Sequence, residues 1–178
     1  MKIALSGLHS QGKTTLLNEL DKINLFKDYV KVPSPTRILQ QEGFKINECG
    51  DESTQLCIMM QHLKNVLQFN SYSIFDRCAL DGYAYGLVFR KKIIDRQLFN
   101  VFKELFYTTI KQYDYIFYIE PELEIINDNT RSLDINFFNE VKDNFECTIR
   151  DNNIPVRRVR GSIQERVDFI KKTIIIND

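Results

Sequence analysis

Residues 5–15 read LSGLHSQGKTT, and this stretch decides the fold. Within it, Gly7 to Thr14 matches the pattern G-x-x-x-x-G-K-[ST] without departure. Glycines at these two positions let the backbone curl so that successive N–H groups point inward at phosphate oxygens. The flanks supply the context that the motif needs. KIALS (residues 2–6) is a short apolar strand candidate, and residues 12–23 have helical spacing. We therefore interpret the stretch as a phosphate-binding loop rather than a loose turn.

The spacing also assigns roles within the loop. The amino end of the following helix favours negative charge, Lys13 can reach β- and γ-phosphates, and the Thr14 hydroxyl can ligate Mg²⁺. ATP and Mg²⁺ are the expected cofactors. The residues expected to contact ATP here are Gly7, Ser10, Gln11, Gly12, Lys13, Thr14 and Thr15.

Apolar runs and helical spacing alternate along the rest of the chain. Strands are predicted over 2–6, 28–32, 72–77, 113–121 and 154–161. Helices are predicted over 12–23, 36–41, 51–69, 79–89, 95–110, 136–151 and 162–174, the last with a capping-box spacing of Ser162 and Glu165. Strands that alternate with helices predict an α/β fold of three layers, with a mainly parallel five-stranded sheet flanked by helices. We expect one domain over residues 1–178.

Composition excludes some classes of protein. The 24 basic and 24 acidic residues give a formal net charge of zero, so no global attraction to nucleic acid or anionic membrane is expected. Apolar runs fall short of the roughly 18 residues of a membrane span, and no secretory leader is evident. The cysteines are scattered, which predicts free thiols, a cytoplasmic location and no Cys/His metal site; they are Cys49, Cys57, Cys78 and Cys147.

Asp76 and Arg77 end the predicted third strand in the run SIFDRCALDGYAYG. This run resembles the DR[SY] motif of P-loop nucleoside and nucleotide kinases, the superfamily of thymidylate kinase, deoxynucleoside kinases and nicotinamide riboside kinase, and above all their small bacteriophage-type members. The resemblance implies that Asp76 lies near the acceptor and Mg²⁺ and that Arg77 lies near the transferring phosphoryl group. Cys78 replaces the usual Ser or Tyr, which leaves the role of the third position open.

Further acceptor contacts follow from the same resemblance. Arg37 after the second strand is expected to hold the acceptor, and Asp81 to orient Arg77 or touch the acceptor. The carboxylate that related kinases place beside Arg37 is absent, so Asp76 becomes the candidate general base. Helices over about 36–70 and 79–110 are expected to build the acceptor pocket. We favour packing roles for Tyr83 and Tyr85 over base stacking.

Two segments near the end of the chain complete the resemblance. NDNTRSLD (127–134) is similar to the DDGxRSxD lid of these kinases, which makes Arg131 the lid arginine within a lid of about 122–136. In the family the loop after the fifth strand abuts adenine, which implies Gly161 and Ser162 beside the base. Four arginines in this region are interpreted as solvated charge rather than a nucleic-acid patch: Arg157, Arg158, Arg160 and Arg166.

Three functions remain open at this point. The leading one is an ATP- and Mg²⁺-dependent kinase of a nucleoside or nucleoside monophosphate, with Lys13, Asp76, Arg77 and Arg131 as catalytic residues and Thr14 and Asp76 as the metal site. A second is a phage-type kinase of a hydroxymethylpyrimidine base within DNA, in the host cytoplasm. A third is a regulatory ATPase or GTPase switch. It is disfavoured because no N-K-x-D stretch is present and nothing suggests the extra sensor domain of an AAA-type machine. Related kinases are often homodimers.

Overall fold

The computed structural model describes residues 1–46, 50–89, 95–122 and 134–177. Its strands are β1 (Lys2–Ser6), β2 (Val30–Val32), β3 (Ser73–Asp76), β4 (Tyr115–Ile119) and β5 (Val156–Val159). Its helices are α1 (Lys13–Asp21), α2 (Pro35–Gln41), α3 (Glu52–Gln68), α4 (Ala79–Phe89), α5 (Arg96–Ile110), α6 (Ile135–Asp151) and α7 (Ile163–Asn177), with a 3₁₀ turn over Asn24–Phe26.

The five strands form one sheet in the order β2-β3-β1-β4-β5, and all four pairings are parallel. The predicted fold class is therefore confirmed. Parallel strands direct all their carboxyl ends to one edge of the sheet, where ligands of such folds bind. β1 lies at the centre of that edge, with Leu5 paired to Asp76 of β3 and Ser6 paired to Tyr118 of β4.

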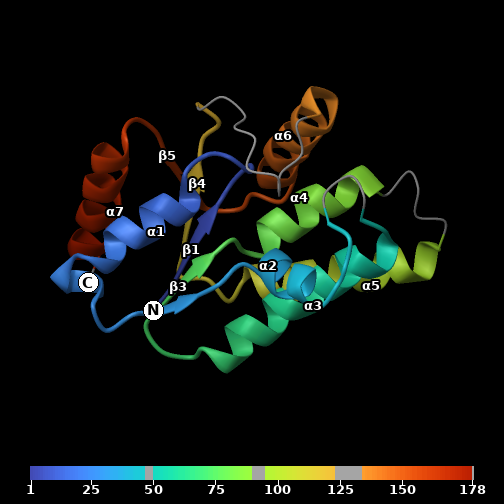
Figure 1. Cartoon of the computed structure of the whole chain (residues 1–178), viewed down its shortest axis with the longest axis horizontal. Helices are drawn as coiled ribbons and strands as arrows, with labels where there is room; N and C mark the ends of the chain where they lie inside the picture. Colours follow the sequence, from blue (N-terminus) through green and yellow to red (C-terminus); the bar gives the residue numbers. More distant parts are fainter. Residues whose placement is uncertain (47–49, 90–94, 123–133, 178) are drawn as a thin grey trace.

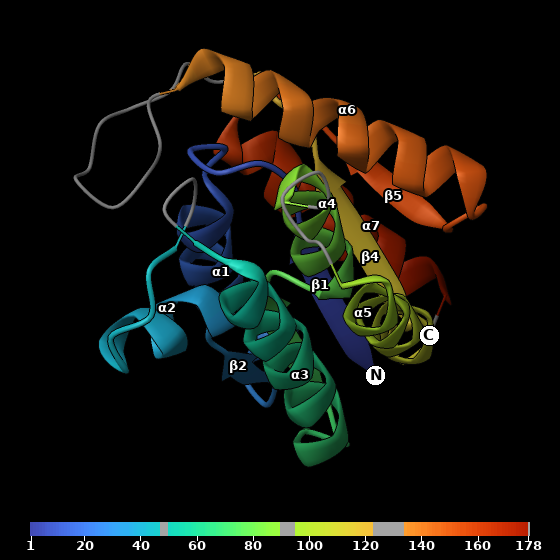
Figure 2. The ribbon, with the colours of Figure 1, turned by 90° about the vertical axis from the view of Figure 1, so that its right-hand side faces the viewer.

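Helices cover both faces of the sheet, giving three layers. Helices α1 and α7 lie on one face, and α3, α4, α5 and α6 lie on the other (Figures 1 and 2). Successive side chains of a strand point to opposite faces, so β1 contributes to two cores. Ile3 and Leu5 pack toward α1 and α7, whereas Ala4 packs toward α3 to α6. A strand buried on both faces reads as a continuous apolar run, which is why KIALS does not alternate.

Side-chain caps fix where several helices begin. The carboxylates of Asp51, Asp95 and Asp134 accept hydrogen bonds from the first backbone N–H groups of α3, α5 and α6. At α7, Glu165 Oε2 accepts from the backbone N–H of Ser162 at 2.7 Å, and the Ser162 hydroxyl oxygen accepts from the backbone N–H of Glu165 at 3.4 Å, as the predicted capping box requires.

Two further observations concern expectations from the sequence. None of the helices in the described residues is long and apolar enough to cross a membrane. Cys57, Cys78 and Cys147 are free thiols, and Cys49 lies outside the described residues.

Candidate active site

The loop between β1 and α1 wraps tightly against the carboxyl edge of the sheet. Gly7 has φ +135°, and a Cβ atom there would lie 2.5 Å from the carbonyl oxygen of Ile119 in β4. Only glycine fits both the space and the backbone angle. Gly12 has φ +76° and caps α1, and Ser10 has φ +62°. The resulting curl explains why glycine stands at the first and the sixth positions of the motif.

Lys13 lies across this loop. Its ammonium group donates to the carbonyl oxygen of Gly7 at 2.7 Å and to that of Leu8, and its side chain is buried. A lysine held over the loop backbone places its charge where the inward-facing N–H groups would bind phosphate oxygens. The geometry is that of an anion site built from backbone and one cation.

Thr14 and Asp76 meet at the border between α1 and β3. The Thr14 hydroxyl donates to Asp76 Oδ2 over 3.1 Å, and an Arg37 Nη2 group donates to the same hydroxyl over 3.1 Å. Mg²⁺ in phosphate sites is held by one or two protein oxygens together with phosphate oxygens. A hydroxyl and a carboxylate within 3.1 Å of each other, beside a phosphate-binding loop, fit that donor set.

Asp81 organises the next part of the site. Its Oδ1 accepts from the Gly7 N–H at 3.2 Å and from Arg77 Nη1 at 2.9 Å, and its Oδ2 accepts from the Cys78 N–H at 3.1 Å. Because the carboxylate accepts hydrogen bonds from three N–H groups, it links the phosphate loop to the segment after β3. Asp81 both accepts from Arg77 and lines the pocket described below, so its position is compatible with either of the two expected roles.

Arg77 itself adopts a backbone conformation that is uncommon for its residue type, with φ +79°. Such strain persists only where the surroundings enforce it, and it clusters at functional sites. Burial opposes the guanidinium charge, but the neighbouring Tyr85, Asp81 and Asp76 outweigh this and raise the pKa of Arg77. The group therefore stays cationic at the edge of the phosphate loop.

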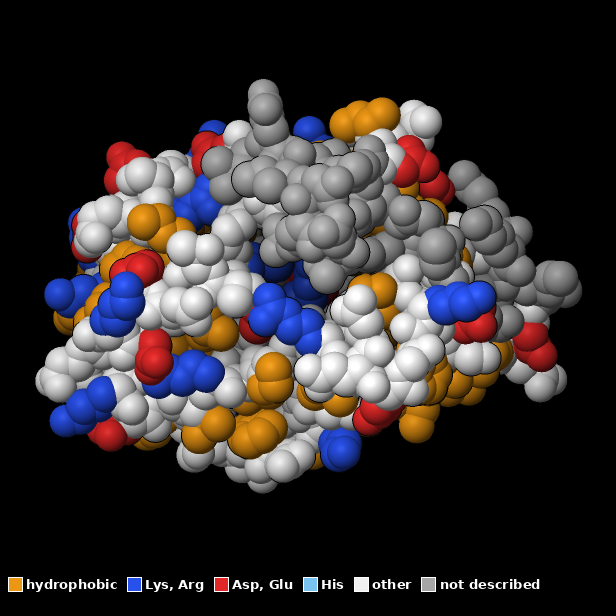
Figure 3. Space-filling view, in the orientation of Figure 1, with side chains coloured by type: hydrophobic (Ala, Val, Ile, Leu, Met, Phe, Trp, Pro, Cys, Tyr) orange, Lys and Arg blue, Asp and Glu red, His pale blue; other side chains and the backbone are white. Residues whose placement is uncertain are grey.

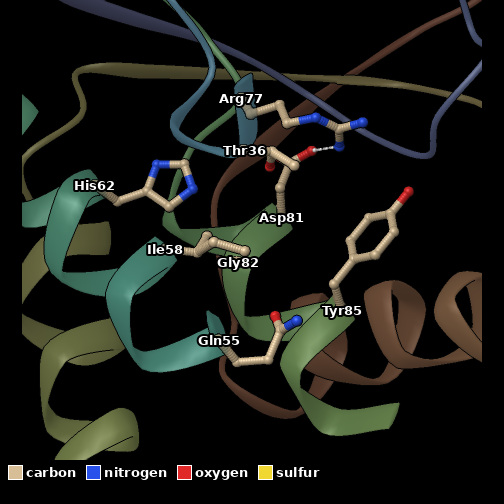
Figure 4. A pocket seen from close by; sticks show the side chains of 8 residues that line it. All are labelled: Thr36, Gln55, Ile58, His62, Arg77, Asp81, Gly82 and Tyr85. Carbon is tan, nitrogen blue, oxygen red and sulfur yellow. Dashed lines mark hydrogen bonds and ion pairs between the residues drawn. The ribbon is translucent and has the colours of Figure 1, made fainter. Parts of the chain in front are cut away.

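A pocket opens beside Arg77 between α3 and α4 (Figure 4). The side chains of Gln55 and His62 reach it from α3, and those of Asp81 and Tyr85 from α4 (Figure 4). The Gln55 Oε1 atom is buried without a hydrogen-bond partner among the described residues, which is costly unless a ligand supplies a donor. The complete lining is Thr36, Gln55, Ile58, His62, Arg77, Asp81, Gly82 and Tyr85.

His62 remains neutral in this pocket. Burial, and then the positive charge of Arg77, lower its pKa from 6.5 to about 3. A neutral imidazole offers one donor and one acceptor nitrogen. Together with the Gln55 amide it can therefore form hydrogen bonds to the polar edge of a heteroaromatic ring. The sequence interpretation assigned no role to either residue. Their spacing of seven on α3, which puts both on one helix face, was the available signal.

Tyr85 connects the pocket with the phosphate loop. Its hydroxyl accepts from the backbone N–H of His9 at 3.0 Å and lies 2.9 Å from His9 Nδ1. The Arg77 guanidinium lies 5.4 Å from the centre of its ring. Tyr83, by contrast, stacks on Phe106 in the core. The packing role expected for Tyr83 matches this position, whereas Tyr85 lies at the site.

Arg166 differs from the sequence interpretation. It was grouped with solvated arginines, yet it is 2% exposed and contacts the phosphate loop, with Nη1 donating to the Gln11 carbonyl oxygen at 2.7 Å. Its Nε donates to the carbonyl oxygen of Gly161 at 2.7 Å. The grouping failed because Arg166 belongs to the buried face of α7, beside Val167, and not to the edge strand.

The other arginines of this region behave differently. Arg157 is exposed. Arg158 of β5 pairs with Glu146 at 2.6 Å. Both Arg158 and Arg160, which directly follows β5, pair with Glu120, so these two arginines lie on the same side, as alternation predicts. Seen from the side of Figure 1, the surface has acidic and basic side chains intermixed, with basic ones gathered in a central hollow (Figure 3).

The remaining predicted residues divide into three groups. Arg37 reaches the phosphate loop at Thr14, as described above, and Thr15 is exposed on α1. Gly161, with φ +85°, and Ser162 form the turn between β5 and α7. Arg131 and most of the predicted lid lie outside the described residues.

This fold and site define a P-loop nucleotide-binding protein. Over residues 2–166 the sequence matches the model of a family described as an AAA domain, and the chain belongs to that family. No curated protein matches the sequence.

Solved structures show the same fold. A deoxyadenosine kinase from M. mycoides has a TM-score of 0.71 at 18% identity, and the match covers 100% of each chain. A thymidylate kinase from Candida albicans has a TM-score of 0.67 at 18% identity, over 99% of this chain and 91% of that one. A NadR protein in complex with NR has a TM-score of 0.69 at 19% identity, over 90% of this chain. The chain spans 46% of the length of that NadR protein. The predicted resemblance to P-loop nucleoside and nucleotide kinases is thus confirmed at the level of the fold.

Proposed function

We propose that the protein is an ATP- and Mg²⁺-dependent kinase that transfers the γ-phosphoryl group to a nucleoside or a nucleoside monophosphate. The observation that carries this proposal is the pocket beside Arg77. A kinase needs, beside the phosphate loop, a second group of polar side chains that can bind an acceptor. Here eight residues, among them Gln55, His62 and Arg77, line a site that is joined to the phosphate loop through Asp81 and Tyr85.

The donor lies on the phosphate loop in this proposal. Lys13 and the loop N–H groups hold the β- and γ-phosphates, and Thr14 and Asp76 hold Mg²⁺, which neutralises charge on the phosphate oxygens. The deoxyadenosine kinase of M. mycoides has been solved with bound dATP and with bound dCTP, which supports a nucleotide as ligand of this fold. Gly161 and Ser162 are proposed to lie beside the donor base.

The acceptor lies between α3 and α4. Its hydroxyl must approach the γ-phosphorus opposite the leaving oxygen, and Arg77 lies between the pocket and the loop to stabilise the charge that develops during transfer. Gln55 and neutral His62 suit a base ring. Arg37 suits the transferring phosphoryl group or an acceptor phosphate. Arg131 is proposed to supply a second positive charge from the lid.

The test is transfer of label from γ-labelled ATP to a panel of nucleosides and nucleoside monophosphates. We expect labelled product with Mg²⁺ present, loss of at least a hundredfold in rate for Lys13→Met, and no change for Lys171→Met, because Lys171 is an exposed residue of α7. ADP formation that depends on Lys13 but labels none of the panel would contradict the proposal.

The two other functions are outcomes of the same test. Label on hydroxymethylated DNA but on no free nucleoside or nucleotide would identify the DNA kinase. The pairing of Arg158 and Arg160 with glutamates leaves less positive charge for such a substrate. Acceptor-independent hydrolysis would identify an ATPase.

A further inference from the structure

Arg166 is a charged side chain that the proposed chemistry does not use, yet it is almost completely buried. A buried guanidinium is retained only where its partners are placed to satisfy it, since an apolar residue of similar volume packs at least as well. On α7 its neighbour Val167 belongs to the core, as do Ile170 and Ile174 further along the helix. Arg166 therefore places a charge on the side of α7 whose other residues are apolar and pack in the core.

The partners of Arg166 come from three segments: the phosphate loop, the segment after β4, and the turn directly before α7. Besides the carbonyl oxygens of Gln11 and Gly161, its Nη2 reaches Glu122 Oε2 over 3.3 Å. Two bonds close the arrangement: the Gly161 N–H donates to Glu122 Oε2 at 2.7 Å, and the Glu122 N–H donates to Gln11 Oε1 at 2.9 Å. These four residues, Gln11, Glu122, Gly161 and Arg166, form what we call the Arg166 bracket.

The bracket fixes the direction of peptide groups. A trans peptide is planar, so its C=O and N–H point in opposite directions. Holding the Gln11 carbonyl oxygen toward α7 therefore turns the Gly12 N–H away from α7. At the turn after β5, both the N–H and the C=O of Gly161 are held. One side chain thus sets a peptide group of the phosphate loop and the β5–α7 turn relative to each other.

The bracket also lies on the side where the donor nucleoside belongs. Gln11, Glu122 and Gly161 follow β1, β4 and β5, which are adjacent in the sheet, whereas Arg77 and the acceptor pocket follow β3 on the opposite side of β1. Acceptor and leaving group lie on opposite sides of the transferred phosphoryl group. The nucleoside of the donor must therefore extend toward the β4–β5 side.

We propose that Arg166 is a positioning residue for the donor, which sets the β5–α7 turn against the phosphate loop so that one ligand engages both. This rests on the proposed function in that the donor is taken to be ATP. Loss of Arg166 uncouples the two halves of the donor site, so the contribution of the nucleoside to binding falls. A side chain that only stabilises the fold would not change the relative affinity for two ligands.

The experiment measures the dissociation constants of ATP and of inorganic tripolyphosphate by titration calorimetry, for the wild type, Arg166→Met and the control Arg157→Met. Arg157 is exposed on β5 and carries the same charge. We expect the ratio of tripolyphosphate to ATP dissociation constants to fall about tenfold in Arg166→Met and to stay unchanged in Arg157→Met. The KM of the acceptor should not change.

A lower melting temperature with an unchanged ratio would overturn the proposal. If Arg166→Met does not fold, Glu122→Ala provides a second test, because Glu122 is at the surface and belongs to the bracket. In this variant the ratio of tripolyphosphate to ATP dissociation constants should fall several-fold. An unchanged ratio would contradict the proposal equally. Failure of the proposed function would look different. If the wild-type protein binds ATP but labels no acceptor, the proposed kinase activity is refuted. The proposal about Arg166 is then still tested by the ratio of tripolyphosphate to ATP dissociation constants.

Discussion

Asp81→Asn tests whether one carboxylate holds the phosphate loop and Arg77 together. Asp81 is 1% exposed and accepts three hydrogen bonds, from the Gly7 N–H, the Cys78 N–H and Arg77. An amide has one oxygen and one NH₂ group, so whichever way it turns, its NH₂ faces at least one of these donors.

The magnitude follows from these contacts. One buried N–H left without an acceptor costs about 1–3 kcal/mol. The loss of the Asp81 charge beside Arg77 adds about 1 kcal/mol, well below the value for a fully buried pair, because the Arg77 side chain is 19% exposed. We expect Asp81→Asn to lower the free energy of unfolding by about 2–4 kcal/mol and to weaken ATP binding, since Gly7 loses its anchor.

The assay is urea denaturation at neutral pH, together with ATP titration. Asp143→Asn is the control, because Asp143 is exposed on α6 and surface substitutions stay within about 0.5 kcal/mol. If Asp81→Asn unfolds at the same urea concentration as Asp143→Asn and binds ATP as the wild type does, the reasoning about Asp81 is wrong.

Three further perturbations test other contacts. Gly7→Ala should abolish ATP binding, because the new Cβ would collide with the Ile119 carbonyl oxygen. The control Gly43→Ala has φ +90° but no atom within 4 Å of the new Cβ, so it should lower the free energy of unfolding only by the backbone strain of about 1–3 kcal/mol. Equal effects of the two variants in calorimetric titrations and urea denaturation would contradict the close contact at Gly7. Folding lowers the pKa of His62 to about 3, so the unfolded chain binds its proton first as pH falls below about 6.5, and stability is lost over that range. Between pH 7 and pH 5 the wild type should lose up to about 2 kcal/mol more than His62→Gln in urea denaturation, and identical losses would refute the neutral imidazole. Tyr85→Phe removes an acceptor from the His9 N–H and should raise the KM for ATP several-fold in steady-state kinetics, while a change in acceptor KM alone would argue against the link to the loop.

The sequence was enough to predict the fold class and the phosphate loop. The eight-residue spacing from Gly7 to Thr14 has one mechanical explanation, and alternation of strands with helices leaves few layer architectures. Asp76 was predicted at the same edge as Thr14 because the carboxyl ends of parallel strands meet there. The 3.1 Å contact between the two side chains agrees with that expectation.

Other parts of the site were beyond the sequence for a physical reason. Periodicity reports which face of an element is buried, but not which distant group a polar side chain meets. Arg166 and Gln11 are 155 positions apart, and His9 and Tyr85 are 76 apart. The pattern around Arg166 looks like an ordinary charged position, and the pattern around Tyr85 like ordinary aromatic packing. Contacts of this kind are set by the strand order, which the pattern of elements does not contain.

The most direct measurement of the central claim is the dependence of ADP formation on an acceptor. The wild type is incubated with labelled ATP and Mg²⁺, with and without each nucleoside or nucleoside monophosphate, and ADP and labelled product are counted together. The kinase account predicts that one acceptor raises ADP formation strongly, that each ADP is matched by one labelled acceptor, and that Arg77→Met removes the acceptor-dependent part. ADP formed at the same rate with every acceptor and with none, and no label outside inorganic phosphate, would contradict the account.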